Sequence, residues 1–289
     1  MNTQEITLLS SPVPDVAPSL PLAGTLYIPD ARTSNGHAPG LIVGHGAGSR
    51  KSRHDEFCRA ACTEGFVVLA LDFRGHGHSG GEADGPLELD IYAAAAHLRA
   101  LPSVDPEKIC YRGSSMGGFY GLKASKEARF AAMALVCPAT ESVILHGLAE
   151  LEAARDTEAP EETEALDPSG EAVTPRQVEA PVLSSGQRFP ISADEPPHWD
   201  LPGLRAYFEQ QQCLSLAACV ECPVLLVHAR ADEVVPFTHT LLIAQSLVVD
   251  TTLVALQEGV HTTAQHDPRV HRLTVEWLLD QVTSCNGHT

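Results

Sequence analysis

Lys108 to Gly118 reads KICYRGSSMGG, an apolar run followed by a glycine-rich turn and the start of a helical stretch. The turn fits the pattern G-x-S-x-G, with Ser115 at its centre. A serine in a sharp strand-to-helix turn needs neighbours without bulky side chains, and Gly113 and Gly117 meet that need. Such a turn exposes the hydroxyl, so Ser115 is predicted to be a nucleophile. The pattern alone also fits a glycine-rich helix start without chemistry, and Ser114 is the competing hydroxyl.

The sequence on both sides of this turn alternates short apolar runs with helical stretches. The apolar runs, each too short for a helix, are Leu41 to Val43, Phe66 to Asp72, Ile109 to Gly113, Ala131 to Cys137, Val224 to His228 and Leu253 to Leu256. The helical candidates are His54 to Thr63, Leu87 to Leu101, Met116 to Ser125, Thr238 to Leu247 and Pro268 to Val282. Two earlier runs, Ile6 to Leu9 and Gly24 to Ile28, are predicted to be edge strands. The alternation predicts an α/β protein with a mostly parallel sheet flanked by crossover helices.

A serine hydroxyl needs a general base, and the base needs a carboxylate that fixes its orientation. On a sheet of this kind the acid and then the base follow the serine, each just past the end of a strand. Asp232 follows the run that begins at Val224, and His261 follows the next run. We therefore predict Asp232 as the acid and His261 as the base. Their rivals are Glu233, Asp250, His228, His266 and His271.

Attack on a carbonyl places negative charge on its oxygen, which two convergent backbone N–H groups usually stabilise. Met116, directly after the serine, is predicted to supply one of them. The loop GHGAG at residues 44–48 offers the second, and Ala47 is the predicted donor. For this loop on its own, a glycine turn without chemistry is the alternative.

With nucleophile, acid, base and loop in this order, the sequence resembles the α/β-hydrolase superfamily. Asp72 to Gly81, DFRGHGHSGG, is similar to the D-x-R-G-x-G-x-S loop of esterases, lipases and serine aminopeptidase-like members. Arg188 through Tyr207, continuing to Pro236, is similar to a segment of cinnamoyl and feruloyl esterase-like hydrolases. The resemblance implies an eight-stranded sheet, a lid after the sixth strand and hydrolysis of acyl esters. It assigns the roles already given to Ser115, Asp232, His261, Ala47 and Met116.

Residues 140–212 interrupt the alternation and are predicted to form the lid, inserted in a core of residues 1–139 and 213–289. Acidic residues crowd Arg155 to Pro175, which favours a flexible or solvated segment. Apolar residues flank it, and Phe189, Trp199 and Tyr207 are the predicted substrate-binding side chains. This acidic insertion and Ser114, where histidine is common, depart from the family pattern.

Composition limits the partners and the compartment. The chain has 289 residues, 44% of them hydrophobic, and a formal net charge of −18. This charge argues against nucleic acid or an anionic membrane as partner. The first residues lack a signal-peptide pattern and no apolar stretch approaches the about 20 residues of a membrane span, so a cytoplasmic location is expected. The dispersed cysteines are expected to be reduced. The oligomeric state stays open, with a homodimer among the states considered.

Two weaker signals suggest metal binding, and neither is adopted. His76, His78, Glu82 and Asp84 lie in or next to the loop already explained by the resemblance. The pair Cys219-x-x-Cys222 lacks a second pair at zinc spacing. We therefore expect no metal and no cofactor.

A basic cluster, Arg50, Lys51 and Arg53, follows the glycine loop. A solvated helix N-terminus is the favoured interpretation, and a contact for an anionic leaving group is the alternative.

The predicted function is that of a cofactor-independent serine carboxylesterase that acts on a small-molecule ester through an acyl-enzyme on Ser115. A thioesterase or an acylaminoacyl-type peptidase or amidase is the alternative, because the same triad serves all acyl transfers. A non-catalytic binding module is the third hypothesis. A module of that kind would be expected to lack a triad member, and here none is missing.

Overall fold

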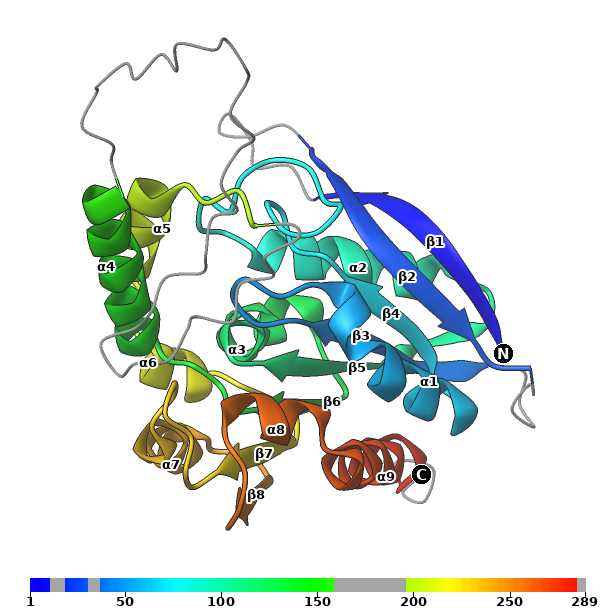
Figure 1. Cartoon of the computed structure of the whole chain (residues 1–289). Helices are drawn as coiled ribbons and strands as arrows, with labels where there is room; N and C mark the ends of the chain where they lie inside the picture. Colours follow the sequence, from blue (N-terminus) through cyan, green and yellow to red (C-terminus); the bar gives the residue numbers. More distant parts are fainter. Residues whose placement is uncertain (11–18, 31–36, 159–195, 285–289) are drawn as a thin grey trace, which may run out of the picture.

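The computed structural model describes residues 1–10, 19–30, 37–158 and 196–284. These residues form an eight-stranded sheet in the order β1-β2-β4-β3-β5-β6-β7-β8 (Figure 1). The strands are β1 (Asn2–Leu9), β2 (Pro21–Ile28), β3 (Ala38–Gly44), β4 (Val67–Leu71), β5 (Val104–Ser114), β6 (Ala132–Val136), β7 (Val224–Ala229) and β8 (Thr251–Leu256). Strand β2 pairs antiparallel with β1 and β4, and every other neighbouring pair is parallel. The predicted α/β fold is confirmed.

The central strands are apolar along their whole length because both faces of the sheet are covered. Strand β4 shows this: Val67, Leu69 and Leu71 pack into one hydrophobic core, and Val68 and Ala70 pack into the other. Successive side chains of a strand point to opposite faces, so an unbroken apolar run serves two cores.

Helices cover the two faces unequally. The helices are η1 (Lys51–His54, a 3₁₀ turn), α1 (Asp55–Thr63), α2 (Glu88–Ala100), α3 (Met116–Ala128), α4 (Glu141–Glu158), α5 (Leu201–Phe208), α6 (Cys213–Ala217), α7 (Phe237–Ser246), α8 (His261–His266) and α9 (Pro268–Ser284). Side chains of α2, α3, α6 and α7 belong to the first core, and those of α1, α8 and α9 to the second. The predicted helices are therefore present, with ends shifted by a few residues.

The segment after β6 adds α4 and α5, which lie side by side at one end of the molecule (Figure 1). Leu148 of α4 and Leu204 of α5 belong to the same buried cluster. An ion pair between Glu152 and Arg205 also joins the two helices. Most of the predicted acidic segment, residues 159–175, lies outside the described residues.

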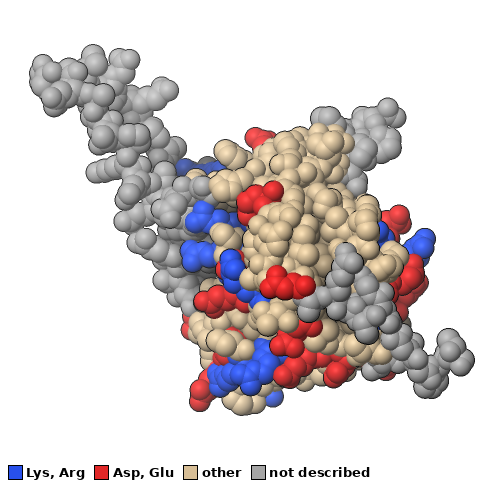
Figure 2. Space-filling view, turned by 90° about the vertical axis from the view of Figure 1, so that its right-hand side faces the viewer, with Lys and Arg blue, Asp and Glu red and all other residues tan. Residues whose placement is uncertain are grey.

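One face of the described surface mixes charges of both signs. In the view of Figure 2, acidic and basic side chains lie beside one another rather than in separate fields. None of the helices within the described ranges is both long and apolar enough to cross a bilayer.

Candidate active site

Ser115 lies in the turn between β5 and α3, with φ of 52° and ψ of −118°. A positive φ is strained for a residue with a side chain, and such strain is found mainly at functional sites. The turn closes only with glycine on both sides. A Cβ on Gly113 would lie 2.4 Å from the Gly117 carbonyl oxygen, and a Cβ on Gly117 would lie 2.6 Å from that of His45. The G-x-S-x-G pattern is therefore explained by backbone packing.

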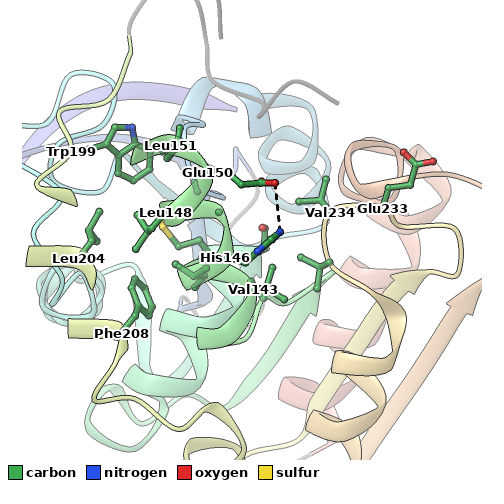
Figure 3. A pocket seen from close by; sticks show the side chains of 17 residues that line it. Val143, His146, Leu148, Glu150, Leu151, Trp199, Leu204, Phe208, Glu233 and Val234 are labelled. Atoms are coloured by element: carbon green, nitrogen blue, oxygen red, sulfur yellow. Dashed lines mark ion pairs between the residues drawn. The ribbon is translucent and has the colours of Figure 1, made fainter. Parts of the chain in front are cut away.

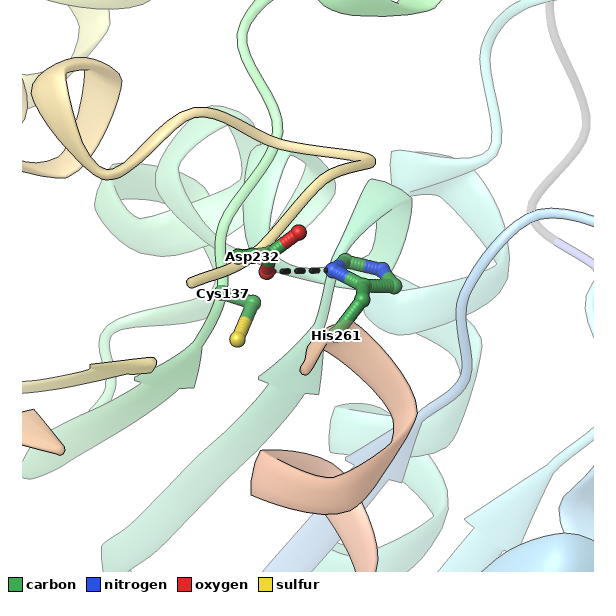
Figure 4. A group of neighbouring side chains, drawn as sticks. All are labelled: Cys137, Asp232 and His261. Carbon is green, nitrogen blue, oxygen red and sulfur yellow. Dashed lines mark hydrogen bonds and ion pairs between the residues drawn. The ribbon is translucent and has the colours of Figure 1, made fainter. Parts of the chain in front are cut away.

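The structure brings Asp232 and His261 together. Asp232 lies in the loop after β7, and His261 is the first residue of α8, which follows β8. His261 Nδ1 lies 2.7 Å from Asp232 Oδ2 (Figure 4). The N–H groups of Val234 and Val235 donate to Asp232 Oδ1 at 2.9 and 2.8 Å. The carboxylate is thus held by its own loop, and it in turn orients the imidazole.

A second imidazole, that of His228 at the end of β7, contacts the same carboxylate. His228 Nε2 lies 3.1 Å from Asp232 Oδ2 and 2.9 Å from the carbonyl oxygen of Val235. Because a carbonyl only accepts, Nε2 carries a proton. In the neutral ring Nδ1 then accepts from the Thr240 hydroxyl at 2.6 Å. Sequence reasoning considered His228 only as a rival base. The sequence feature that could have predicted this contact is the position of His228 at a strand end, four residues before Asp232.

These contacts keep Asp232 ionised. Burial alone would raise the pKa of Asp232, but hydrogen bonds from His228 and His261 outweigh it and hold the pKa well below its ordinary range. Burial raises the pKa of the neighbouring Cys137 thiol, which therefore stays neutral. A negative carboxylate against Nδ1 stabilises the imidazolium that a general base becomes.

In the described part of the chain, one group of side chains has the spacing of metal ligands. It consists of Cys137, Asp232 and His261, whose potential ligand atoms lie within 4.8 Å of one another. The hydrogen bond between Asp232 and His261 already uses the two atoms that face each other (Figure 4). The arrangement therefore suits proton transfer.

Ala47 and Met116 line the same pocket as Ser115. Met116 is the first residue of α3, so its N–H has no acceptor within the helix. In the described part of the chain neither the Met116 nor the Ala47 N–H donates to another residue. Two unpaired N–H groups beside a serine can stabilise an oxyanion. The competing Ser114 hydroxyl, by contrast, is fully buried.

No hydrogen bond among the described residues joins Ser115 Oγ to His261. Nucleophile–base hydrogen bonds often tighten only when substrate is bound. The structure therefore shows the contact between Asp232 and His261, and a contact between His261 and Ser115 stays a prediction.

An apolar pocket of about 130 Å³ adjoins Ser115 (Figure 3). Its walls come mainly from α4, α5 and the loop after β7. The lining residues besides Ala47, Ser115 and Met116 are Ala139, Val143, Ile144, His146, Gly147, Leu148, Glu150, Leu151, Trp199, Leu204, Phe208, Glu233, Val234 and Val235. A cavity of about 150 Å³ holds a benzene molecule. The pocket therefore has room for one group of about that size.

The structure places two of the three predicted substrate-binding side chains. Trp199 lines the pocket. Tyr207 does not: its hydroxyl donates to Glu88 Oε2 at 2.7 Å. Leu204 and Phe208, four residues apart, line the pocket from the same helix and leave Tyr207 on an adjacent face. Phe189 lies outside the described residues.

Lys51 of the basic cluster is engaged in contacts within the fold. Lys51 is buried, and its Nζ pairs with Glu5 Oε2 at 2.8 Å. Its backbone N–H donates to Asp72 Oδ1 at 2.6 Å. Lys51 therefore ties η1 to β1 and to the end of β4.

Taken together, the sheet order and the strained strand-to-helix turn at Ser115 show that the chain has the α/β-hydrolase fold. Residues 37–157 match the family model of the serine aminopeptidases, S33. The matched part contains Ala47, Ser115 and Met116 but ends before Asp232 and His261.

Individual relatives extend this similarity. The quorum-quenching protein AidA of Acinetobacter baumannii is 32% identical over 123 residues, so the match spans 40% of each chain. Est1E of Butyrivibrio proteoclasticus, in a structure with ferulic acid bound, has a TM-score of 0.64 at 21% identity, covering 91% of this chain and 96% of Est1E. A thermophilic esterase from Thermogutta terrifontis has a TM-score of 0.66 at 19% identity, covering 96% and 99%. At these identities the structural matches establish the fold.

Proposed function

We propose that the protein is a serine carboxylesterase that hydrolyses esters of small to medium or aromatic acids. The main support is that Ser115 lines an apolar pocket of about 130 Å³. The backbone N–H groups of Ala47 and Met116, which line the same pocket, donate to no other described residue. An acyl group bound in that pocket would place its carbonyl carbon next to the serine hydroxyl. Esterase structures among the similar folds support the proposal.

The proposed reaction has two halves. His261 takes the proton of Ser115 Oγ as this oxygen attacks the ester carbonyl, and the N–H groups of Ala47 and Met116 stabilise the oxyanion. Collapse of the intermediate breaks the bond to the alcohol oxygen, which receives the proton from His261. Water then attacks the acyl-serine with His261 again as base, and the acid and free Ser115 are released. Asp232 remains ionised throughout and orients His261.

The test is turnover of p-nitrophenyl acetate, butyrate and benzoate by the wild type and by Ser115→Ala. We expect Ser115→Ala to lower kcat by about 10³-fold or more, because nucleophile and base act as a unit. Ser114→Ala is the matched control, since this neighbouring hydroxyl is buried away from the pocket. Wild-type-like turnover in Ser115→Ala would contradict the proposal.

A second measurement tests the nucleophile without a chosen substrate. A fluorophosphonate probe should phosphonylate Ser115 stoichiometrically, and mass spectrometry of the peptide would locate the adduct. The same assays with matched thioester and anilide substrates separate an esterase from a thioesterase or an amidase. Higher kcat/KM for the thioester or the anilide than for the ester would replace the proposed substrate class.

A further inference from the structure

Arg112 is a buried cation that the reaction does not use. It lies on β5, three residues before Ser115, and is 1% exposed. No carboxylate among the described residues pairs with it: its guanidinium contacts His54, Gln265 and Phe57. Placing a guanidinium in the interior is costly unless its N–H groups are satisfied. The contacts that compensate this cost therefore indicate what the residue does.

The guanidinium makes three contacts, each with a different part of the fold. Nη1 lies 2.9 Å from His54 Nδ1, at the end of η1. Nη2 donates to the carbonyl oxygen of Gln265 at 2.9 Å. The guanidinium carbon lies 4.7 Å from the ring centre of Phe57 in α1. Arg112 thus connects β5 with η1, α1 and α8.

Two of these elements carry predicted site residues. His261 begins α8, and Gln265 lies in the last turn of the same helix. A helix end with its free carbonyl groups attracts a cation. His271 Nε2 reaches the same Gln265 carbonyl at 3.1 Å, from α9. The element η1 directly follows the loop that contains Ala47.

We propose that Arg112 is a positioning residue that holds the helix of His261 and the turn after the Ala47 loop in register with the strand that ends in Ser115. The proposal rests on the function proposed above. Arg112 does not touch substrate. It sets the separation of nucleophile, base and oxyanion donor, which are supplied by three different segments of the chain.

The electrostatic state of the cluster fits this role. Burial lowers the pKa of Arg112 to about 10, so it remains charged at neutral pH. Burial and the charge of Arg112 hold the pKa of His54 well below its ordinary value. Neutral His54 therefore accepts the hydrogen bond at Nδ1. A lysine would keep the charge but could not present two separated N–H groups in a fixed plane.

The experiment compares Arg112→Met and Arg112→Lys with Arg99→Met. Arg99 is the matched control because it also donates to backbone carbonyl oxygens, those of Ala128 and Arg129, but between α2 and α3, away from the pocket. We expect Arg112→Met to lower kcat by about 10- to 100-fold with KM within about twofold, because small misplacements of catalytic groups have effects of this size. Arg112→Lys should recover part of the loss. Arg99→Met should keep the wild-type kcat.

Hydrogen exchange gives a readout that does not depend on activity. The amides of residues 261–266 should exchange faster in Arg112→Met and Arg112→Lys than in the wild type, and Arg99→Met should leave them unchanged. A folded Arg112 variant with wild-type kcat and wild-type exchange would overturn the inference. If Arg112→Met fails to fold, Arg112→Lys decides by the same two measurements. The experiment separates failure of the proposed function from failure of this inference. If the proposed function is wrong, the wild type shows no ester turnover, and hydrogen exchange still tests the role of Arg112.

Discussion

At the residue scale, one carboxylate oxygen of the candidate site contacts two histidines. Asp232 Oδ2 is contacted both by His261 Nδ1 at 2.7 Å and by His228 Nε2 at 3.1 Å. His261 is the first residue of α8, whereas His228 lies in β7 and is fully buried. The two imidazoles therefore have different proposed roles: His261 is the predicted base, and His228 donates a hydrogen bond to Asp232.

The role of His228 can be tested by removing its donor. We expect His228→Leu to lower kcat by about 10- to 100-fold, since a hydrogen bond to a charged group is worth about 1.5–3 kcal/mol. His228→Gln, which can offer an N–H near the same place, should lose less. The measurement is kcat and KM on p-nitrophenyl butyrate for both variants, with melting temperatures recorded alongside. Equal kcat in the wild type and a folded His228→Leu would show that Asp232 needs no second donor.

At the element scale, strands were easier to predict than helix faces. A short apolar run predicts a strand even when the neighbouring strands are unknown. The loops that follow two such strands then predicted that Asp232 and His261 lie near one another. The face of a short helix depends on what packs against it. In α5, Leu204 and Phe208 line the pocket, whereas Tyr207 contacts Glu88 of α2 and Tyr120 of α3, and these partners are distant in the sequence. The contact between Arg112 and Gln265 joins residues 153 positions apart, and no local pattern indicates it.

The pocket formed by α4 and α5 should set the size of the acyl group. Leu148 is 4% exposed and lines the pocket, so Leu148→Trp would fill much of its volume. We expect kcat/KM for p-nitrophenyl benzoate to fall by about 10-fold or more relative to acetate, because an overfilled pocket rejects the larger group. Tyr207→Phe is the aromatic control and should keep the wild-type ratio. A Leu148→Trp variant with an unchanged benzoate-to-acetate ratio would place the acyl group elsewhere.

At the scale of the whole molecule, desolvation favours the neutral form of several histidines, of which His45, His54, His76 and His271 are buried. Burial lowers the pKa of a set of them: His45, His54, His76, His97, His239, His266 and His271. An imidazole whose pKa is lowered by folding binds its proton more readily in the unfolded chain. Its contribution to stability is therefore present above the unfolded pKa of about 6.5 and is lost as pH falls below it. The carboxyls of Asp72, Glu88 and Asp90, whose pKa burial raises, act in the opposite sense.

A substitution at His45 separates the contribution of one histidine to the pH dependence of stability from the opposing contribution of the carboxyls. Its Nε2 accepts from the Phe73 N–H at 3.1 Å and its Nδ1 lies 2.8 Å from the Gly46 carbonyl, so the folded ring is neutral. Burial lowers its pKa to about 4. Between pH 7 and pH 5 this one group should account for a loss of about 2 kcal/mol in the free energy of unfolding.

We therefore expect His45→Gln to lose about 2 kcal/mol less than the wild type between these two pH values, measured by urea unfolding. His198→Gln, which removes an exposed histidine, should lose as much as the wild type. The comparison uses differences within each variant, so any general destabilisation by the substitution cancels. An equal loss of stability in His45→Gln and the wild type would mean that His45 binds its proton equally well in the folded and unfolded chain. That result would rule out a buried neutral ring at His45, within the loop that contains Ala47.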